Sequence, residues 1–297
     1  MSLLLKDILN IAVARFEDEG CLTPKLDAEV LFCHMLNKDK SYLFIHYGDL
    51  LDDKTCEEYF RLVDLRASGM PVQYITGKQE FMGLTFKVNE HVLIPRQDTE
   101  TLVETAMEEI RNRKAPMGGL QVLDLCCGSG AIAVSLAHFL KNYNIKITAA
   151  DISTEALKVA KENAGLNNVS KDIQFLEGDL FSPFPKNKKG RGKKQFDLIV
   201  SNPPYIPQSR LITLMREVRE HEPMLALDGG VDGIDFYVRI LREAHAYLKK
   251  NGVLLLEIGY DQGRVVQSLA EAAGAYKPAR IIKDLAGRDR VVSILII

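Results

Sequence analysis

The stretch Asn202-Pro203-Pro204-Tyr205 combines residue types that could perform chemistry on a planar NH2 group. It follows an apolar run, 198–200, that predicts a buried strand. Neither proline carries an N–H, and each keeps the preceding residue out of the α-helical region, so the predicted loop is stiff and extended. An amide side chain, a backbone carbonyl and an aromatic ring would then lie together at the end of the strand. The alternative is a strand that ends in a proline turn, with Tyr205 packed at its rim.

A second candidate site lies at 122–133, where an apolar strand leads through Gly128-Ser129-Gly130 into a helix rich in small residues. In an α/β sheet such a turn is a ligand-binding position. The pattern also matches a dinucleotide fingerprint, so a nicotinamide-dependent oxidoreductase is one alternative. However, the glycines come late after the strand, and Asp124 would repel a pyrophosphate. Asp124 would instead attract the ammonium group of a cofactor that carries an amino acid.

Further acidic residues follow the next two strands of this region. Asp151 ends the strand after Gly130, where a carboxylate can hold ribose hydroxyl groups. Asp179-Leu180-Phe181 follows the third strand and could flank an adenine ring with one polar and two apolar contacts, although Asp179 could also cap a helix. Together these residues predict S-adenosylmethionine rather than NAD as the cofactor.

The elements that must position these residues alternate between strand and helix from Leu120 onward. Such alternation predicts an α/β fold in which helices cover both faces of a parallel sheet. A closing antiparallel hairpin is expected at 279–297, split near Gly287. The predicted strands are 122–125, 145–150, 173–177, 198–201 and 253–258, and the predicted helices include 154–164 and 235–249.

Three domains are expected along the chain. Residues 1–75 carry apolar side chains at helical spacing and predict a small helical domain. The segment 70–77 is expected to interrupt this helical pattern, and 76–96 is predicted to be a β-hairpin connector. Residues 97–297 would form the domain that contains the sheet.

Two charged segments have less specific patterns. Arg96 and Glu100 are interpreted as a solvated charge pair, and Asp98 or Thr99 as the cap of the helix that follows. Residues 186–194 include six basic side chains and no apolar anchor, which is typical of a solvated loop. A contact with nucleic acid or the ribosome is the alternative for this loop.

The composition is that of a globular protein, with 46% hydrophobic and 26% charged residues among 297. The net charge of −2 provides no overall attraction for nucleic acid. The five cysteines lack metal-ligand spacing, so they are expected to be reduced thiols and no metal site is predicted. The chain shows no signal-peptide pattern and no run long enough for a membrane span, which predicts a cytoplasmic location and no membrane partner.

Over nearly the whole chain these motifs resemble the HemK/PrmC-type protein-(glutamine-N5) methyltransferases, which modify the glutamine of the Gly-Gly-Gln motif in peptide chain release factors. The resemblance also rests on segments 71–77, 93–100, 222–230 and 287–290. It implies a Rossmann-like class I methyltransferase domain with a mixed seven-stranded sheet that uses S-adenosylmethionine. It further implies that release factors are the protein partners, in translation termination, and that the helical N-terminal domain recognises them.

The resemblance also implies a role for each residue of the two candidate sites. Asn202, Pro203 and Tyr205 would be catalytic, because Asn202 Oδ1 and the Pro203 carbonyl accept the two N–H hydrogens of the substrate glutamine while Tyr205 packs on the amide plane. Substrate binding would involve Asn202, Pro203, Pro204 and Tyr205. Cofactor binding would involve Asp124, Cys126, Cys127, Gly128, Ser129, Gly130, Asp151, Asp179, Leu180 and Asn202.

Some positions depart from the usual family pattern. Cys126 stands where the first glycine of the cofactor loop is expected, and Met82 stands where tryptophan is common. Two alternatives remain for the function. An adenine-N6 DNA or RNA methyltransferase would use the same acceptors on the NH2 group of a flipped base, although the near-neutral charge argues against direct nucleic-acid binding. A binding module that retains an idle cofactor fold would perform no reaction, and the intact motif at 202–205 argues against it.

Overall fold

The computed structural model describes residues 3–113, 117–185 and 195–297 of the chain. The basic segment at 186–194 therefore lies outside the described residues. The chain divides into two compact units, one formed by residues 1–78 with 214–221 and the other by residues 79–213 with 222–297. Within the described ranges, no helix is long and apolar enough to cross a membrane.

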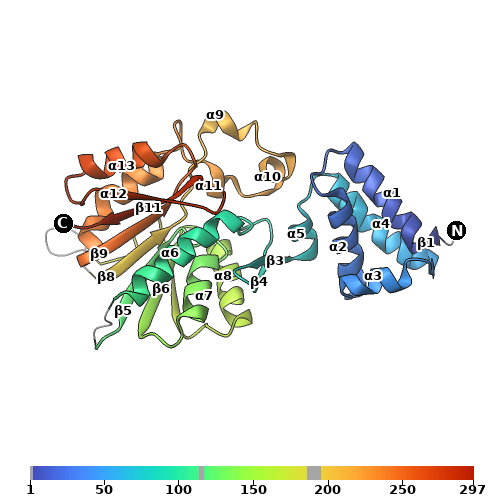
Figure 1. Ribbon diagram of the computed structural model, residues 1–297, viewed down its shortest axis with the longest axis horizontal. Coiled ribbons are helices and arrows are strands. Elements are labelled where there is room, and N and C mark those ends of the chain that lie inside the picture. The colour runs from blue at the N-terminus through green and yellow to red at the C-terminus, as the bar shows by residue number, and fades with distance from the viewer. Residues whose placement is uncertain (1–2, 114–116, 186–194) are drawn as a thin grey trace. The chain divides into compact units, whose positions relative to one another are not determined.

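The first unit is helical, as its apolar periodicity predicts (Figure 1). Its helices are α1 (Leu5–Asp18), α2 (Pro24–Leu36), α3 (Lys40–His46), α4 (Asp53–Ala67), α5 (Val72–Thr76) and α10 (Arg216–His221), and its two-residue strands are β1 (Leu3–Leu4) and β2 (Leu50–Leu51). Arg66 on α4 is buried and pairs with Asp27 on α2 at 2.7 Å and with Glu217 on α10 at 2.8 Å. Removing one partner of such a buried pair costs about 3–5 kcal/mol, so this ion cluster ties α10 to the N-terminal helices.

The expected interruption of helical structure at 70–77 is wrong for Val72–Thr76, which form α5. Pro71 caps this helix at its N-terminus, where a backbone N–H is not needed. Gly77 ends it in the left-handed conformation, with φ of 68°. A helix this short spans little more than one turn, so apolar spacing cannot reveal it.

The expected hairpin is a two-stranded sheet of β3 (Lys78–Phe81) and β4 (Leu84–Lys87). Between the strands, Met82 and Gly83 both have positive φ, 53° and 69°, as in a type I′ turn, whose twist matches that of paired strands. Phe81 and Phe86 are buried in an edge-to-face contact. The backbone N–H of Met82 donates to the Glu100 carboxylate at 2.7 Å, which anchors the turn to the following helix.

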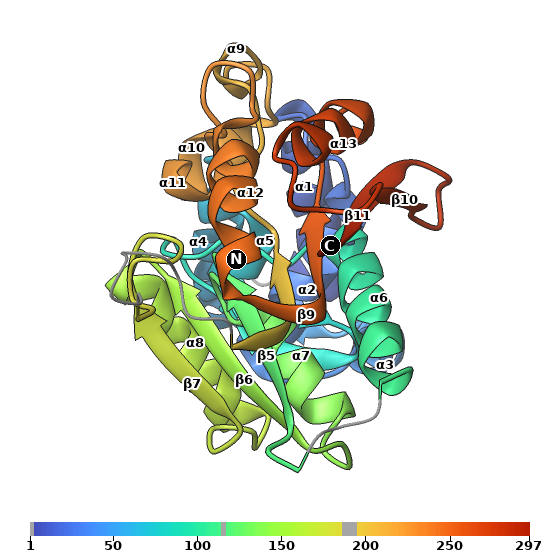
Figure 2. The same cartoon turned by 90° about the vertical axis from the view of Figure 1, so that its left-hand side faces the viewer.

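The second unit is built on a mixed seven-stranded sheet, which confirms the predicted fold class (Figure 2). Its strands are β5 (Leu120–Leu125), β6 (Ile145–Asp151), β7 (Ile173–Glu177), β8 (Phe196–Ser201), β9 (Leu248–Glu257), β10 (Arg280–Lys283) and β11 (Asp289–Leu295). In the order β10-β11-β9-β8-β5-β6-β7, the strands β9 to β7 pair in parallel, whereas β11 and β10 add antiparallel pairs at one edge. The chain proceeds from β5 outward to β7 and then returns with β8 on the other side of β5. The carboxyl ends of β5 and β8 therefore form a topological switch point, where ligands bind in α/β sheets.

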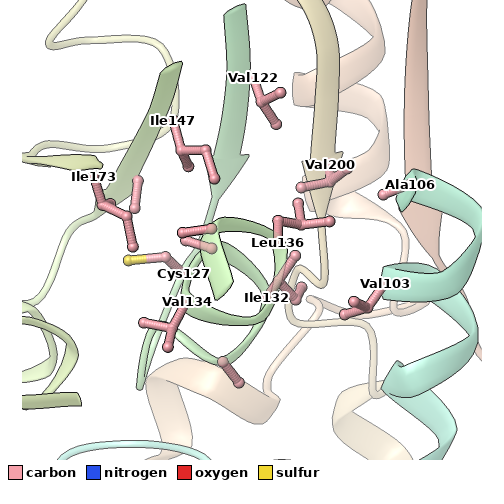
Figure 3. Close-up of a cluster of buried hydrophobic side chains, with 14 of the residues drawn as sticks. Val103, Ala106, Val122, Cys127, Ile132, Val134, Leu136, Ile147, Ile173 and Val200 are labelled. Carbon is pink, nitrogen blue, oxygen red and sulfur yellow. The ribbon is translucent and has the colours of Figure 1, made fainter. Parts of the chain in front are cut away.

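Side chains of the central strands alternate between two cores on opposite faces of the sheet. The helices that cover the faces are α6 (Glu100–Arg111), α7 (Ala131–Phe139) and α8 (Thr154–Leu166) on one side, and α12 (Asp235–Tyr247) and α13 (Gly263–Ala272) on the other. Val122 belongs to the first core and its neighbour Leu123 to the second. Figure 3 shows part of the first core, to which Val122, Val200 and Leu136 belong. Burial on both faces explains why these strands are continuous apolar runs in the sequence.

Candidate active site

The turn after β5 adopts the left-handed conformation at three of its positions. Cys126, Gly128 and Gly130 have φ of 59°, 52° and 77°. Gly130 also leaves no room for a side chain, because a Cβ there would lie 3.0 Å from Ala160 Cβ on α8. Cys126 thus holds a glycine-type conformation at a cost of roughly 1–2 kcal/mol. Cys126 is among the residues that line the pocket described below.

Asp151, the last residue of β6, lies beside this turn. Its Oδ2 accepts the backbone N–H of Gly128 at 2.8 Å, and its Oδ1 accepts that of Ser153 at 2.9 Å. Burial raises the pKa of Asp151, while these backbone hydrogen bonds act in the opposite direction. The carboxylate is therefore fixed in orientation, and its remaining lone pairs can accept hydrogen bonds from ligand hydroxyl groups.

Asp124 is fully buried and does not line the pocket. Its Oδ2 accepts the backbone N–H of Ala133 at 3.1 Å, near the start of α7. Its Oδ1 has no hydrogen-bond partner in the part of the chain that is described, and burial raises the pKa of this carboxyl to about 8. The structure thus uses Asp124 to anchor α7, and its contact with a cofactor ammonium group stays a prediction.

Asp179 and Leu180, which follow β7, line the same pocket as two residues of α12. Asp179 pairs with Arg239, whose guanidinium carbon lies 5.5 Å from the centroid of the Phe236 ring. Leu180 is buried and has φ of 48°. No motif marked Phe236 or Arg239, because their spacing is that of any amphipathic helix. The Phe236 ring and the Leu180 side chain offer apolar surface, and the charged groups of Asp179 and Arg239 lie beside it. Such a combination suits a purine base.

Asn202 follows β8 on the other side of the switch point. Its Nδ2 donates to Thr99 Oγ1 at 3.2 Å, and Thr99 ends the short 3₁₀ helix η1 (Gln97–Thr99). Asn202 and Pro204 line the pocket, whereas Pro203 and Tyr205 are not among its lining residues. The Tyr205 hydroxyl donates to the Glu257 carboxyl at 3.3 Å. The contacts of Pro203 and Tyr205 with a substrate amide stay predictions.

The backbone at Tyr205 is packed closely against a glycine-rich loop. A Cβ at Gly229 would lie 2.7 Å from Tyr205 Cα, and one at Gly233 would lie 2.5 Å from the Tyr205 carbonyl oxygen. The Gly229 N–H also donates to the Ile206 carbonyl at 2.9 Å. Close backbone approach therefore explains why the segment 226–233 needs glycine where it meets the Asn-Pro-Pro-Tyr loop.

The solvated charge pair expected between Arg96 and Glu100 is wrong. Arg96 forms an ion pair with Glu222, whose buried carboxylate also accepts the backbone N–H of Ile94 at 3.2 Å. Glu100 accepts the backbone N–H of Met82 instead. Arg96 and Glu222 are far apart in the sequence, so helical spacing could not reveal their pairing.

The expected side-chain cap of α6 is also wrong. Thr99 occupies the N-cap position, but its side chain makes no capping hydrogen bond. Asp98 pairs with Arg290 of β11 at 2.8 Å. Both side chains are therefore committed to tertiary contacts, which leaves the Thr99 hydroxyl to meet Asn202.

The loops at the switch point enclose a pocket of about 300 Å³, within the range of small-molecule sites. It brings together the following residues predicted for the site: Cys126, Cys127, Gly128, Ser129, Asp151, Asp179, Leu180, Asn202 and Pro204. Asp124, Gly130, Pro203 and Tyr205 are not part of its lining. Lining residues that were not predicted for the site include Arg96, Thr99, Ile152, Leu225, Phe236 and Arg239. The sequence did contain a signal for Arg96 and Thr99, because both lie in segment 93–100, one of the segments on which the family resemblance rests.

The chemistry of the pocket fits a nucleoside. Asp151 offers carboxylate oxygens to ribose, and Ile152, Leu180 and Phe236 offer apolar surface to a base. Cys126 is among the free cysteines. No group of His, Cys, Asp and Glu in the described ranges is arranged to hold a metal ion.

Comparisons with known proteins define the class. A model described as a methyltransferase domain matches residues 117–289, and one described as the PrmC N-terminal domain matches residues 7–77. The crystal structure of the hMettl16 catalytic domain in complex with MAT2A 3'UTR hairpin 6 has a TM-score of 0.55 at 14% identity, and covers 87% of this chain and 92% of that one. At this identity the likeness shows the fold alone. The chain has a class I methyltransferase fold.

Two relatives identify the family. The release factor glutamine methyltransferase of Moorella thermoacetica is 43% identical over 286 residues, 96% of either chain. That of Clostridium botulinum is 39% identical over 290 residues, 98% of either chain. The chain therefore belongs to the release factor glutamine methyltransferase family.

Proposed function

We propose that this protein transfers a methyl group from S-adenosylmethionine to the side-chain amide nitrogen, N5, of the glutamine in the Gly-Gly-Gln motif of peptide chain release factors. The observation that carries the proposal is the position of Asn202 on the wall of the pocket that Asp151 and the turn at 126–129 also line. One pocket thus combines groups suited to a cofactor with an amide suited to an acceptor. The protein would act in the cytoplasm, in translation termination.

S-adenosylmethionine supplies, when bound, a methyl group that a sulfonium charge makes electrophilic. Asp151 would hold the ribose hydroxyl groups, since its carboxylate is fixed by two backbone N–H groups. Ile152, Leu180 and Phe236 would pack against the adenine base. Asp124 would contribute negative charge toward the ammonium group, because one of its oxygens has no hydrogen-bond partner among the described residues.

The acceptor side must activate a poor nucleophile, because an amide nitrogen shares its lone pair with the carbonyl. Asn202 Oδ1 and the Pro203 carbonyl would accept the two N–H hydrogens of the glutamine, and Tyr205 would pack on the amide plane. These contacts fix the nitrogen in line with the methyl group. Such positioning can supply roughly 7–11 kcal/mol of a reaction barrier. The nitrogen–carbon bond would form as the bond between the methyl carbon and the sulfonium sulfur breaks, and the methylated nitrogen, which is then acidic, would release one proton to water.

The alternative of an adenine-N6 DNA or RNA methyltransferase would use the same acceptor pair. The relatives do not favour it, because they are named for a protein substrate. The two functions predict different labelled products, so one assay separates them.

The test is transfer of label from S-adenosylmethionine to a purified release factor, beside the same factor with Gln→Ala in its Gly-Gly-Gln motif. We expect label on the normal factor only. Label on both factors, or on RNA or DNA with none on the factor, would overturn the proposal.

The matched test of the site compares Asn202→Ala with Asn112→Ala, which changes an exposed asparagine at the end of α6. Asn202→Ala is expected to lower kcat about 100-fold, as loss of one preorganised hydrogen-bonding group does, while the Kd for S-adenosylmethionine changes less than about threefold. Asn112→Ala should leave both values unchanged. Equal losses of binding and turnover in Asn202→Ala would contradict its assignment to the acceptor.

A further inference from the structure

Asn163 on α8 is a fully buried residue whose side-chain amide holds the backbone at two separate places in the chain. Its Oδ1 accepts the backbone N–H of Lys87 at 2.6 Å. Its Nδ2 donates to the Lys87 carbonyl at 3.0 Å and to the Ser129 carbonyl at 2.9 Å. Asn163 is not among the residues that line the pocket. It can therefore act on a bound ligand only through the backbone that it holds.

These three hydrogen bonds determine which way the Asn163 amide points. An amide nitrogen has two hydrogens to donate, and an amide oxygen only accepts. In the observed orientation each hydrogen meets a carbonyl and the oxygen meets an N–H. A flipped amide would place its oxygen against two carbonyls and its NH2 against the Lys87 N–H. Because unpaired buried polar groups are costly, this site holds the amide in one orientation.

The first place that Asn163 holds is the cofactor turn, residues 126–130. Ser129 lines the pocket, and its carbonyl leads into Gly130, which has φ of 77°. In a regular helix the Ala133 N–H would donate to the Ser129 carbonyl, four residues earlier. Here the Ala133 N–H donates to Asp124 at 3.1 Å instead. Asn163 thus provides a hydrogen bond that fixes this carbonyl, and with it the peptide plane before Gly130.

The second place is the end of β4, which leads into another part of the pocket wall. Lys87 is the last residue of β4. In the turn that follows, Asn89 Oδ1 accepts the His91 N–H at 3.1 Å, and the Asn89 carbonyl accepts the Val92 N–H at 3.1 Å. The wall segment, residues 91–96, contributes five of its six residues to the pocket lining. Because hydrogen bonds close the turn at 89–92, the position of the Lys87 backbone determines where this wall segment begins.

We propose that Asn163 is a positioning residue that holds the cofactor turn in its ligand-binding shape and couples this turn to the wall segment. This inference rests on the proposed function, in which the cofactor turn binds S-adenosylmethionine. No motif in the sequence marks Asn163, because a single asparagine within a helix has no chemical signature. Its role becomes visible only when the fold places it between Lys87 and Ser129.

Two further contacts hold β4 against this part of the chain, and neither involves the cofactor turn. Asn167 Nδ2, at the end of α8, donates to the Thr85 carbonyl at 3.0 Å. On the surface, Lys87 Nζ pairs with Glu162 at 3.1 Å. Loss of either contact would loosen β4 but leave the Ser129 carbonyl held. Asn167 is therefore a matched control for Asn163, since both are asparagines whose amides donate to backbone carbonyls of β4.

The first experiment measures the Kd for S-adenosylmethionine by calorimetric titration, beside kcat at saturating cofactor. A turn that keeps its binding shape for only a tenth of the time binds about tenfold more weakly. We expect Asn163→Ala to raise Kd at least about tenfold and Asn167→Ala to raise it less than about threefold. In Asn163→Ala, kcat at saturation should stay within about threefold of the parent, because Asn202 is held by Thr99 and not by this amide.

Hydrogen exchange tests the coupling between the two places. Segments that share one buried amide order each other, so a ligand at the cofactor turn should also slow local opening of β4. At labelling times shorter than global unfolding, we expect S-adenosylmethionine to slow exchange at 84–87 at least about threefold in the parent and in Asn167→Ala. The effect should be absent in Asn163→Ala. Residues 84–87 do not line the pocket, and neither does the edge strand β10, where exchange should not change.

Val292→Ala controls for loss of stability alone, because Val292 is buried in the core on the other face of the sheet. Its Kd should stay within about twofold of the parent. Parental binding by Asn163→Ala would overturn the inference, as would equal weakening in Asn163→Ala and either control. If Asn163→Ala does not fold, the parent still decides, since unchanged exchange at 84–87 on cofactor binding would contradict the coupling. A parent that does not bind S-adenosylmethionine would instead refute the proposed function, so the two failures are distinguishable.

Discussion

Gln262 Nε2 donates to the carbonyl oxygen of Tyr205 at 3.0 Å, which links the loop after β8 to the loop after β9. The same nitrogen donates to the Gly233 carbonyl at 3.1 Å. Gln262 Oε1 accepts the Gly259 N–H at 2.9 Å and the Tyr237 hydroxyl at 3.2 Å. One buried amide thus holds the Tyr205 carbonyl of the Asn-Pro-Pro-Tyr loop with its nitrogen, while its oxygen is fixed by Gly259 and Tyr237.

Gln262→Glu should therefore destabilise the protein and slow methyl transfer. The substituted carboxylate would place a negative oxygen against the carbonyls of Tyr205 and Gly233 and would lose two buried hydrogen bonds, each worth about 1–3 kcal/mol when its partner is left unpaired. We expect the free energy of unfolding at pH 8 to fall by about 2–5 kcal/mol, with a smaller loss at pH 5, where the introduced carboxyl can be protonated and donate. Urea denaturation at the two pH values measures this. Gln174→Glu, on the exposed surface of β7, is the control and should change stability by less than about 0.5 kcal/mol.

Gly229→Ala should impair the acceptor side while sparing the cofactor side. The new Cβ would lie 2.7 Å from Tyr205 Cα and 2.8 Å from its carbonyl carbon, so the loop must shift. A shift of this kind can lower turnover about 100-fold, because the reaction depends on alignment. We expect kcat to fall by that order, with the Kd for S-adenosylmethionine within about threefold of the parent. Gly48→Ala, where a Cβ meets nothing within 4 Å, should be neutral. Unchanged kcat in Gly229→Ala would show that the loop at Tyr205 tolerates displacement.

Much of the fold could be predicted because its signals are local. The strands at 173–177 and the helix beginning at Thr154 agree with the observed β7 and α8, since apolar runs and spacing report burial directly. The turn at Gly128-Ser129-Gly130 was recognisable because left-handed backbone requires particular residues. By contrast, the short helix α5 escaped notice because little more than one turn shows no periodicity.

Many of the contacts that hold the site's loops in place could not be predicted, because they join distant parts of the chain. Arg96 and Glu222 lie 126 residues apart, and Asn202 and Thr99 lie 103 apart. Local rules instead suggested an Arg96–Glu100 pair, two opposite charges four residues apart in the sequence. Phe236 and Arg239 line the pocket from a helix whose pattern is merely amphipathic. Motifs identify residues on the site's loops, but only the fold shows which side chains hold those loops.

Cys126 offers a test of the backbone at the cofactor turn. Its φ of 59° is tolerated by cysteine at a cost, but a β-branched side chain is far more restricted there. Cys126→Val should therefore lower stability by about 1–3 kcal/mol and weaken S-adenosylmethionine binding at least tenfold. Cys126→Gly, which removes the strain, should bind within about threefold of the parent. Thermal unfolding and calorimetric titration measure both effects, and equal binding by the valine and glycine variants would show that this conformation is not needed by the ligand.

Asp124 makes the stability of the protein depend on pH. Burial raises the pKa of its carboxyl to about 8, well above the ordinary value of 3.8 that it regains on unfolding. Between these values the folded state holds more protons than the unfolded state, so the free energy of unfolding falls as the pH rises from about 4 to 8 and is level above that. Asp124→Asn should abolish this pH dependence of the free energy of unfolding, because the asparagine amide can still accept the Ala133 N–H but does not titrate. We expect stability curves of the parent and the variant to diverge by a few kcal/mol across this range.

The same carboxyl should report on the cofactor. If the ammonium group of S-adenosylmethionine meets Asp124, binding favours the charged carboxylate and releases a proton at pH 7. Calorimetric titration in buffers of different ionisation enthalpy measures that proton directly. We expect release approaching one proton from the parent and none from Asp124→Asn, together with at least tenfold weaker binding by the variant. Equal proton release from both proteins would restrict Asp124 to anchoring α7, and the ammonium group would then need another acceptor in the pocket.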